Sequence, residues 1–152
     1  MLLHYFIKKE NKEKKLAENI YSIIVSKSQK TMNNNTFLLK KNYQTSFEII
    51  TFFIICYLKI FKTKKTKNYK KINQNIINLF ISDLDKSLRD IGIADISLGK
   101  YVKTYVKKFY YRLPKIDFIL DKQSSIELKD YIETLDIIDK TNANLIAEFL
   151  LI

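Results

Sequence analysis

Glycine and proline are almost missing from this sequence of 152 residues, which contains two glycines, Gly92 and Gly99, and one proline, Pro114. A sheet of many strands needs glycine- or proline-bearing turns at short intervals along the chain. Two glycines seven positions apart also cannot form the glycine-rich loops that cradle nucleotide phosphates. The scarcity therefore favours an all-α fold with short links, and it argues against ATP- and dinucleotide-dependent enzymes.

Cysteine and histidine are just as scarce, with one of each. Cys56 lies in the apolar run ITFFIICYLKI, and as the only cysteine it cannot form an internal disulfide or build a cysteine metal site. A catalytic thiolate needs a neighbouring base, and the only histidine, His4, stands close to the N-terminus. We therefore interpret Cys56 as a core residue and expect no catalysis, no cofactor and no metal site.

Charge is divided unevenly along the chain, whose formal net charge is +11. Residues 1–76 carry a net charge of +12 and residues 77–152 a net charge of −1, and the only arginines are Arg89 and Arg112. Base readout and bidentate phosphate recognition favour arginine, so we expect no specific DNA binding. The lysines allow two interpretations. They attract RNA, a ribosome or an anionic membrane without sequence specificity, or they form a solvated surface with no binding role.

Hydrophobic periodicity predicts one helical domain of about six helices over residues 14–152, after an N-terminal extension over residues 1–13. Ser97 has the position of a helix cap, Pro114 ends that helix or opens the next, and Ser124 starts a capping box. The segments predicted to be helical cover residues 14–28, 46–61, 70–91, 97–113, 116–122, 124–135 and 141–152. In the first and third of them, helical spacing assigns to the apolar face Leu16, Ile20, Ile23 and Ile24, and Ile72, Ile76, Phe80, Leu84, Leu88 and Ile91.

Residues 46–61, SFEIITFFIICYLKIF, form the most hydrophobic part of the chain. Glu48 and Lys59 leave only ten residues between charges, whereas a membrane span needs about twenty apolar residues. We therefore expect a buried central helix. The basic connection KTKKTKNYKK that follows is either a solvated link or a contact for a polyanion.

The segment from Leu79 to Arg112, LFISDLDKSLRDIGIADISLGKYVKTYVKKFYYR, carries the most specific pattern. A charged amphipathic helix ends in Leu-Arg-Asp-Ile-Gly, and after a short link come Gly-Lys-Tyr-Val-Lys and an aromatic pair. The segment closely resembles the signature of the ubiquinol–cytochrome c chaperone family, assembly factors for the respiratory cytochrome bc complex. The matching positions are Asp83, Asp85, Ser87, Leu88, Arg89, Gly92, Asp95, Gly99, Lys100, Lys103, Phe109, Tyr110 and Arg112.

Weaker similarity to this family extends over residues 16–120. ENIYSIIVSKS resembles the family's first helix, and TSFEIITFFIICYLKIFK resembles its hydrophobic helix. Three features depart from the family: the hydrophobic helix lacks a histidine, MNNNTFLLKKN replaces a Gly-Val-Pro-like turn, and Ala94 stands where glycine is common. The fold inference survives these departures, but any role for that histidine does not.

The resemblance implies an all-helical assembly chaperone, not an enzyme, that binds newly synthesised cytochrome b. For mitochondrial members of the family, the resemblance implies that the chaperone works with a small partner protein near the ribosomal exit. On this interpretation Gly92 and Gly99 set two helix ends, and the corner between them presents the partner-binding residues Asp85, Arg89, Gly92, Asp95, Gly99, Lys100 and Lys103. The alternative is that this corner is only the tightest turn of the core.

A function of another class is a basic helical module that binds RNA or a ribosome, whose binding would be sensitive to salt. For the chaperone we expect a cytoplasmic location at the inner membrane of a bacterium, with peripheral contact to anionic lipid, or the matrix side in a mitochondrion. The N-terminal sequence does not resemble a secretory signal or a transit peptide, so we expect no removed targeting segment.

Overall fold

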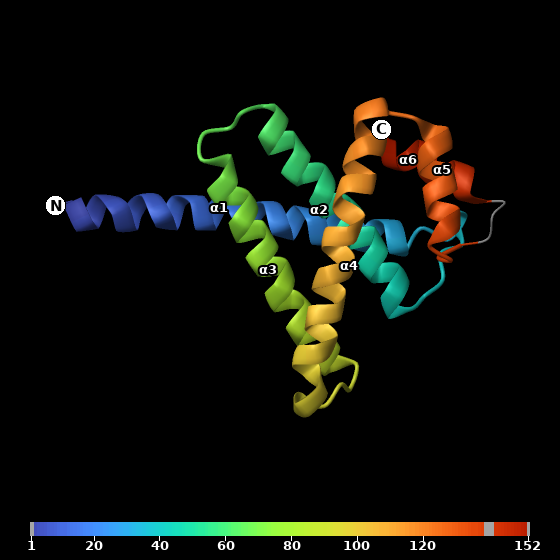
Figure 1. The fold of residues 1–152 in the computed structure, drawn as a ribbon, viewed down its shortest axis with the longest axis horizontal. Helices are drawn as coiled ribbons and strands as arrows, with labels where there is room; N and C mark the ends of the chain where they lie inside the picture. The colour runs from blue at the N-terminus through green and yellow to red at the C-terminus, as the bar shows by residue number, and fades with distance from the viewer. Residues whose placement is uncertain (1, 139–141, 152) are drawn as a thin grey trace. The chain divides into compact units, whose positions relative to one another are not determined.

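The computed structural model describes residues 2–138 and 142–151, with side chains from Lys12 onward (Figure 1). Within these ranges the chain forms six α-helices and one short 3-10 helix, which confirms the all-α prediction. The elements are α1 (Leu2–Met32), η1 (Asn35–Phe37), α2 (Tyr43–Thr63), α3 (Tyr69–Asp90), α4 (Asp95–Lys122), α5 (Ser125–Thr134) and α6 (Ala143–Leu151). Thr141 and Ile152, the outer residues of the predicted last helix, lie outside the described residues.

The chain divides into two compact units. Unit 1 contains Met1–Ile23 and Tyr57–Tyr111, and unit 2 contains Ile24–Cys56 and Arg112–Ile152. Three helices, α1, α2 and α4, contribute residues to both units. Because α1 begins at Leu2, helix also covers the segment that the sequence predicts as an extension.

The core of unit 1 is built on α3, whose buried residues recur every fourth position as predicted: Ile72, Ile76, Phe80, Leu84 and Leu88. Phe80 packs against Phe109 of α4 with ring centroids 5.2 Å apart. On the side of α1, the Tyr21 hydroxyl donates a hydrogen bond of 2.6 Å to Asp83 Oδ2. Each buried large side chain contributes roughly 1.5–3 kcal/mol, so this stripe holds α3 in place within unit 1.

The core of unit 2 contains the first part of α2, where Phe47, Ile49, Phe52, Ile54 and Ile55 are buried as predicted. By length and composition α2 is apolar enough to cross a membrane, yet half of its apolar window is buried inside the protein. α5 packs against α6, and Phe37 of η1 meets Phe149 of α6 with ring centroids 5.0 Å apart. These contacts join η1, α5 and α6 within unit 2.

The buried face of α1 differs from the prediction. Leu16 and Ile23, expected in the core, are 41% and 47% exposed, whereas Ala17 is fully buried. The buried stripe instead continues into polar residues, Ser28 and Thr31. Both hydroxyls donate to backbone carbonyls one turn earlier, at 2.8 and 2.9 Å, so their burial leaves no unpaired donor.

The bounds of α4 also differ from the prediction. The helix begins at Asp95 rather than after Ser97, runs through Pro114, and includes the segment expected to form a separate short helix. A proline inside a helix removes one backbone hydrogen bond. Here Ile116 and Ile119, just beyond the proline, are buried, and their packing keeps the chain helical.

Cys56 lies on α2, forms no disulfide and is half-buried, so the expectation of a core position is wrong in degree.

Candidate functional site

The corner between α3 and α4, residues 85–103, begins with a helix end that requires glycine. Gly92 has a φ of 98°, and its N–H donates to the carbonyl of Arg89 at 3.0 Å. The N–H of Ile93 donates to the carbonyl of Leu88 at 3.1 Å. This pair of bonds is the Schellman motif, in which a left-handed residue closes a helix. The prediction that Gly92 ends the helix is therefore confirmed.

Gly99 has a different place from the one predicted. It lies inside α4, in the second turn of the helix, and does not set a helix end. A Cβ added at Gly99 would meet no atom within 4 Å, so close packing does not require glycine there either. Glycine in a helix interior costs about 1 kcal/mol relative to alanine. Neither a helix end nor close packing therefore requires glycine at position 99.

Arg89 joins the two sides of the corner. Its Nε lies 3.1 Å from Asp85 Oδ2 on the same helix, and its Nη1 lies 2.5 Å from Asp95 Oδ1, at the first residue of α4. The hydrogen bond to Asp85, the charge of Asp85 and the charge of Asp95 raise the pKa of the Arg89 guanidinium above its ordinary value. Because all three side chains are exposed, each pair adds little stability. Their effect is to hold the charges in fixed positions on the surface.

The corner also exposes isoleucine side chains. Ile96 is completely exposed and Ile91 is 55% exposed, although helical periodicity assigns Ile91 to the core. Beyond Gly99, the side chains of Lys100 and Lys103 are exposed along α4. The corner therefore combines bare aliphatic surface with fixed charges of both signs. Sequence reasoning missed the isoleucines because Ile91 fits the apolar period of the preceding helix, which ends one residue before it.

The positions that carry the family resemblance fall into two groups. Leu88 and Phe109 are buried in the core of unit 1, and Asp83 accepts the hydrogen bond from Tyr21 of α1. Others lie on the surface, among them Tyr110, which is 50% exposed. The first group supports α3 and α4, and the surface positions between residues 85 and 103 belong to the corner.

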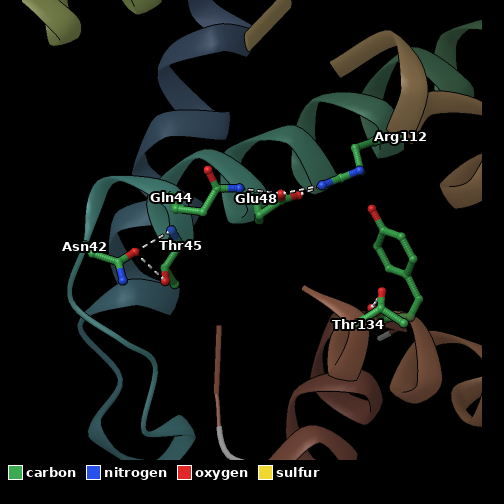
Figure 2. Close-up of polar contacts among 7 residues, drawn as sticks. Asn42, Gln44, Thr45, Glu48, Arg112 and Thr134 are labelled. Carbon is green, nitrogen blue, oxygen red and sulfur yellow. Dashed lines mark hydrogen bonds and ion pairs between the residues drawn. The ribbon is translucent and has the colours of Figure 1, made fainter. Parts of the chain in front are cut away.

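Unit 2 contains a buried ion pair between Glu48 and Arg112. Arg112 is the last position of the family pattern. Glu48 of α2 has a side chain that is 1% exposed. Arg112 Nε donates to Glu48 Oε2 at 3.1 Å, and Arg112 Nη2 donates to Glu48 Oε1 at 3.0 Å (Figure 2). Gln44 Nε2 donates to Glu48 Oε1 at 2.7 Å. The carboxylate thus has a bidentate arginine partner and a further donor.

The start of α2 places Gln44 and Glu48. Asn42 Oδ1 accepts a hydrogen bond of 2.8 Å from the backbone N–H of Thr45, which caps the helix in the usual way (Figure 2). Gln44 and Glu48 are one turn apart, so both reach the same side of the helix.

Tyr131 of α5, a half-buried tyrosine whose hydroxyl is buried, lies in the electrostatic field of this ion pair. The hydroxyl of Tyr131 on α5 has no hydrogen-bond partner among the described residues. Burial raises the pKa of Tyr131 well above its ordinary value, while the charge of Arg112 lowers it and that of Glu48 raises it. The hydroxyl therefore stays protonated beside the ion pair.

The pairing of Glu48 with Arg112 was not predicted, although the sequence contains a signal for it. Glu48 is the only acidic residue between positions 19 and 82, and it stands in an apolar helix. A buried carboxylate requires a cation, and arginine is the preferred partner. The two arginines of the chain were therefore the candidates. Across the described residues, no group of three or more histidine, cysteine or acidic side chains is arranged to hold a metal ion.

Comparison with known proteins identifies the family. A sequence model described as "Ubiquinol-cytochrome C chaperone" matches residues 35–135. The chain belongs to the ubiquinol–cytochrome c chaperone family. The match includes the corner and both members of the buried ion pair, so the resemblance expected from residues 79–112 is confirmed.

A solved structure is similar over nearly the whole chain. The crystal structure of the Cbp3 homolog from Brucella abortus superposes with a TM-score of 0.79 at 22% sequence identity, covering 99% of this chain and 84% of that chain. At this identity the likeness shows a shared all-helical fold. No curated protein matches the sequence of the chain.

The two glycines should respond in opposite directions to alanine. Gly99→Ala should raise the free energy of unfolding by about 1 kcal/mol, because it removes the entropic cost of glycine and fills open space. Gly92→Ala should lower it by about 1–2 kcal/mol, because a Cβ is strained at positive φ. Urea unfolding of both variants checks this, and a loss of stability in Gly99→Ala would contradict it.

Removing one partner of the buried ion pair should be costly. We expect Glu48→Leu and Arg112→Met each to lower the free energy of unfolding by about 3–5 kcal/mol, because the remaining charge is buried alone. The double variant should lose less than the sum of the two. Urea unfolding of the four proteins gives the coupling energy, and Asp85→Asn at the exposed pair, expected to cost under about 1 kcal/mol, is the control. Additive losses would contradict the pairing.

Tyr131 should make stability fall at alkaline pH. The unfolded chain releases this proton near the ordinary pKa of 10.0, whereas the folded protein keeps it. Above that pH the unfolded state binds fewer protons, so the free energy of unfolding decreases as pH rises. Tyr131→Phe should be close to neutral at pH 7, and it should show a smaller decrease above about pH 10. Parallel stability curves for the two proteins would contradict the raised pKa.

Proposed function

We propose that this chaperone promotes assembly of the respiratory cytochrome bc complex by binding newly synthesised cytochrome b at the corner between α3 and α4. Membership of the family supports the assembly role. The observation that carries the site is the exposure of Ile91 and Ile96 beside the Arg89 ion pairs. The proposal assigns no catalytic step to the chain.

The chemistry of the corner suits a client of this kind. A membrane protein that has not yet been assembled presents apolar segments with charged residues near their ends. Covering an exposed isoleucine contributes roughly 1.5–3 kcal/mol. The cations Lys100 and Lys103 and the fixed Arg89 cluster can pair with the charges that flank such a segment. Because the apolar part of this contact is not screened by salt, client binding should survive high ionic strength.

Gly99 supports the same proposal. It lies between the isoleucines and Lys100, it is exposed, and the fold does not require it. A glycine on a helix surface lets another backbone approach closely. A client segment lying across α4 would use this space, so Gly99→Ala should weaken client binding even though it stabilises the helix.

Capture of the client from native membranes tests the corner. We expect the tagged wild-type chain to enrich cytochrome b at low and high salt, detected by mass spectrometry. Ile96→Ser should reduce this enrichment at least about tenfold, since one isoleucine contact is lost. Arg89→Glu and Lys100→Glu should also reduce it. The matched controls are Ile126→Ser, at an isoleucine of α5 that is 71% exposed, and Lys107→Glu, which should both behave like the wild type.

Two results would contradict the proposal. Equal losses in Ile96→Ser and Ile126→Ser would show that the corner has no special role. Recovery of RNA without cytochrome b, lost at high salt, would favour the basic RNA- or ribosome-binding module instead. The same experiment reports any small partner protein that co-purifies, and recovery of the chaperone with the membrane fraction tests the proposed location at the membrane surface.

A further inference from the structure

The segment that joins α2 to α3 concentrates positive charge in unit 1. Residues 62–71 contain six lysines, and no acidic residue occurs between positions 49 and 82. The side chains of Lys62, Lys64, Lys65, Lys67, Lys70 and Lys71 are all exposed. The like charges of these lysines add up to a positive potential at the surface, which attracts anions.

Glu13 brings a second run of lysines to the same place. Asn68 Nδ2 donates to Glu13 Oε1 at 2.6 Å, and Lys71 Nζ lies 3.3 Å from Glu13 Oε2. Glu13 is buried, and its neighbours in α1, Lys12 and Lys14, are exposed. Two basic segments that are far apart in the sequence therefore meet at this contact. The single carboxylate neutralises only one of their charges.

A hollow of about 300 Å³ lies at this junction, lined by Asn68, Tyr69, Lys70 and Lys71. Two of its four lining residues are cations, and Asn68 contributes a polar side chain. Asn68 and Lys71 already contact the Glu13 carboxylate, so the hollow forms part of the cationic surface and is not by itself an anion site.

We propose that this lysine face, consisting of Lys12, Lys14, Lys62, Lys64, Lys65, Lys67 and Lys70, binds the anionic headgroups of a phospholipid membrane. Clusters of four to eight basic residues bind anionic lipid surfaces in this way. The inference goes beyond the client proposed above and does not depend on the identity of that client.

The surroundings of the lysine face favour lipid over RNA. The face contains no arginine, which RNA-binding surfaces use for stacking and bidentate contacts. In the described parts of residues 12–23 and 57–71, each large hydrophobic side chain that is strongly exposed is aliphatic: Leu16, Ile23 and Ile60. Single-strand binding uses exposed aromatic rings instead. Ile60 lies one turn before Lys64, whose N–H donates to the Ile60 carbonyl at 3.0 Å, so an aliphatic side chain and a cation are neighbours.

The lysine face and the corner lie at opposite ends of α3. Lys71 and Arg89 are 18 residues apart in one helix, which corresponds to about 27 Å along its axis. A membrane bound at the first end would leave the second end accessible to a client segment.

Sedimentation with vesicles tests the lysine face directly. We expect the full chain to bind vesicles of phosphatidylcholine mixed with phosphatidylglycerol, and to bind pure phosphatidylcholine at least about tenfold more weakly. Lys64→Gln, Lys65→Gln and Lys67→Gln in one protein should lower binding to the anionic vesicles about tenfold or more. The matched control removes the same charge elsewhere, through Lys107→Gln, Lys115→Gln and Lys129→Gln, and should retain binding. Ile60→Ser should weaken vesicle binding without affecting an RNA oligonucleotide.

Several outcomes would overturn the inference. One is equal binding to both kinds of vesicle, and another is equal loss in the two triple variants, which would indicate only an effect of net charge. Binding to the RNA oligonucleotide but not to anionic vesicles would assign the face to nucleic acid. Circular dichroism of each variant shows that it is folded, so a loss of binding reports on the surface. The two proposals can fail separately. Absence of vesicle binding would not change the capture of cytochrome b, and absence of capture would not change vesicle binding.

Discussion

The buried carboxylate of Glu48 constrains how the helices of unit 2 are packed. An ionised group in a protein core is tolerated only with a cation and further hydrogen bonds, and Arg112 and Gln44 supply both. The bidentate geometry fixes the position of α4 along α2, because a shift by one residue would separate the charges. It also accounts for a carboxylate in a helix as apolar as α2, because the charge has its partner inside unit 2 (Figure 2).

Both arginines of the chain form forked contacts with carboxylates, but in different environments. Arg112 is largely buried and its contact holds two helices together, whereas Arg89 is exposed and its contacts hold a surface. The lysines, by contrast, have flexible side chains and are mainly solvated. A chain with 27 basic residues thus uses arginine where geometry matters and lysine where charge alone is enough.

Local chemistry determines which parts of the fold could be predicted. The buried stripe of α3, the left-handed Gly92 and the Ser124 cap, whose oxygen accepts from the N–H of Glu127 at 3.3 Å, all depend on neighbouring residues. Errors occurred where distant packing decides. Pro114 lies inside α4 because the buried residues beyond it hold the helix together, and Ile91 is exposed because the helix ends before it. The pairing of Glu48 with Arg112 links residues 64 positions apart, which no local pattern reveals.

Unit 1 separates two kinds of surface along one helix. Near the start of α3 the surface is cationic and its attraction is long in range but screened by salt. Near the end of α3 aliphatic side chains lie beside the paired charges of Asp85, Arg89 and Asp95, so the apolar part of the attraction is short in range and insensitive to salt. Lipid and client would compete for a single surface that had both properties. Under the two proposals made above, the ends of one rigid helix would divide these tasks: electrostatic attraction would bring the chaperone to a membrane, and the apolar corner would remain accessible to a client segment.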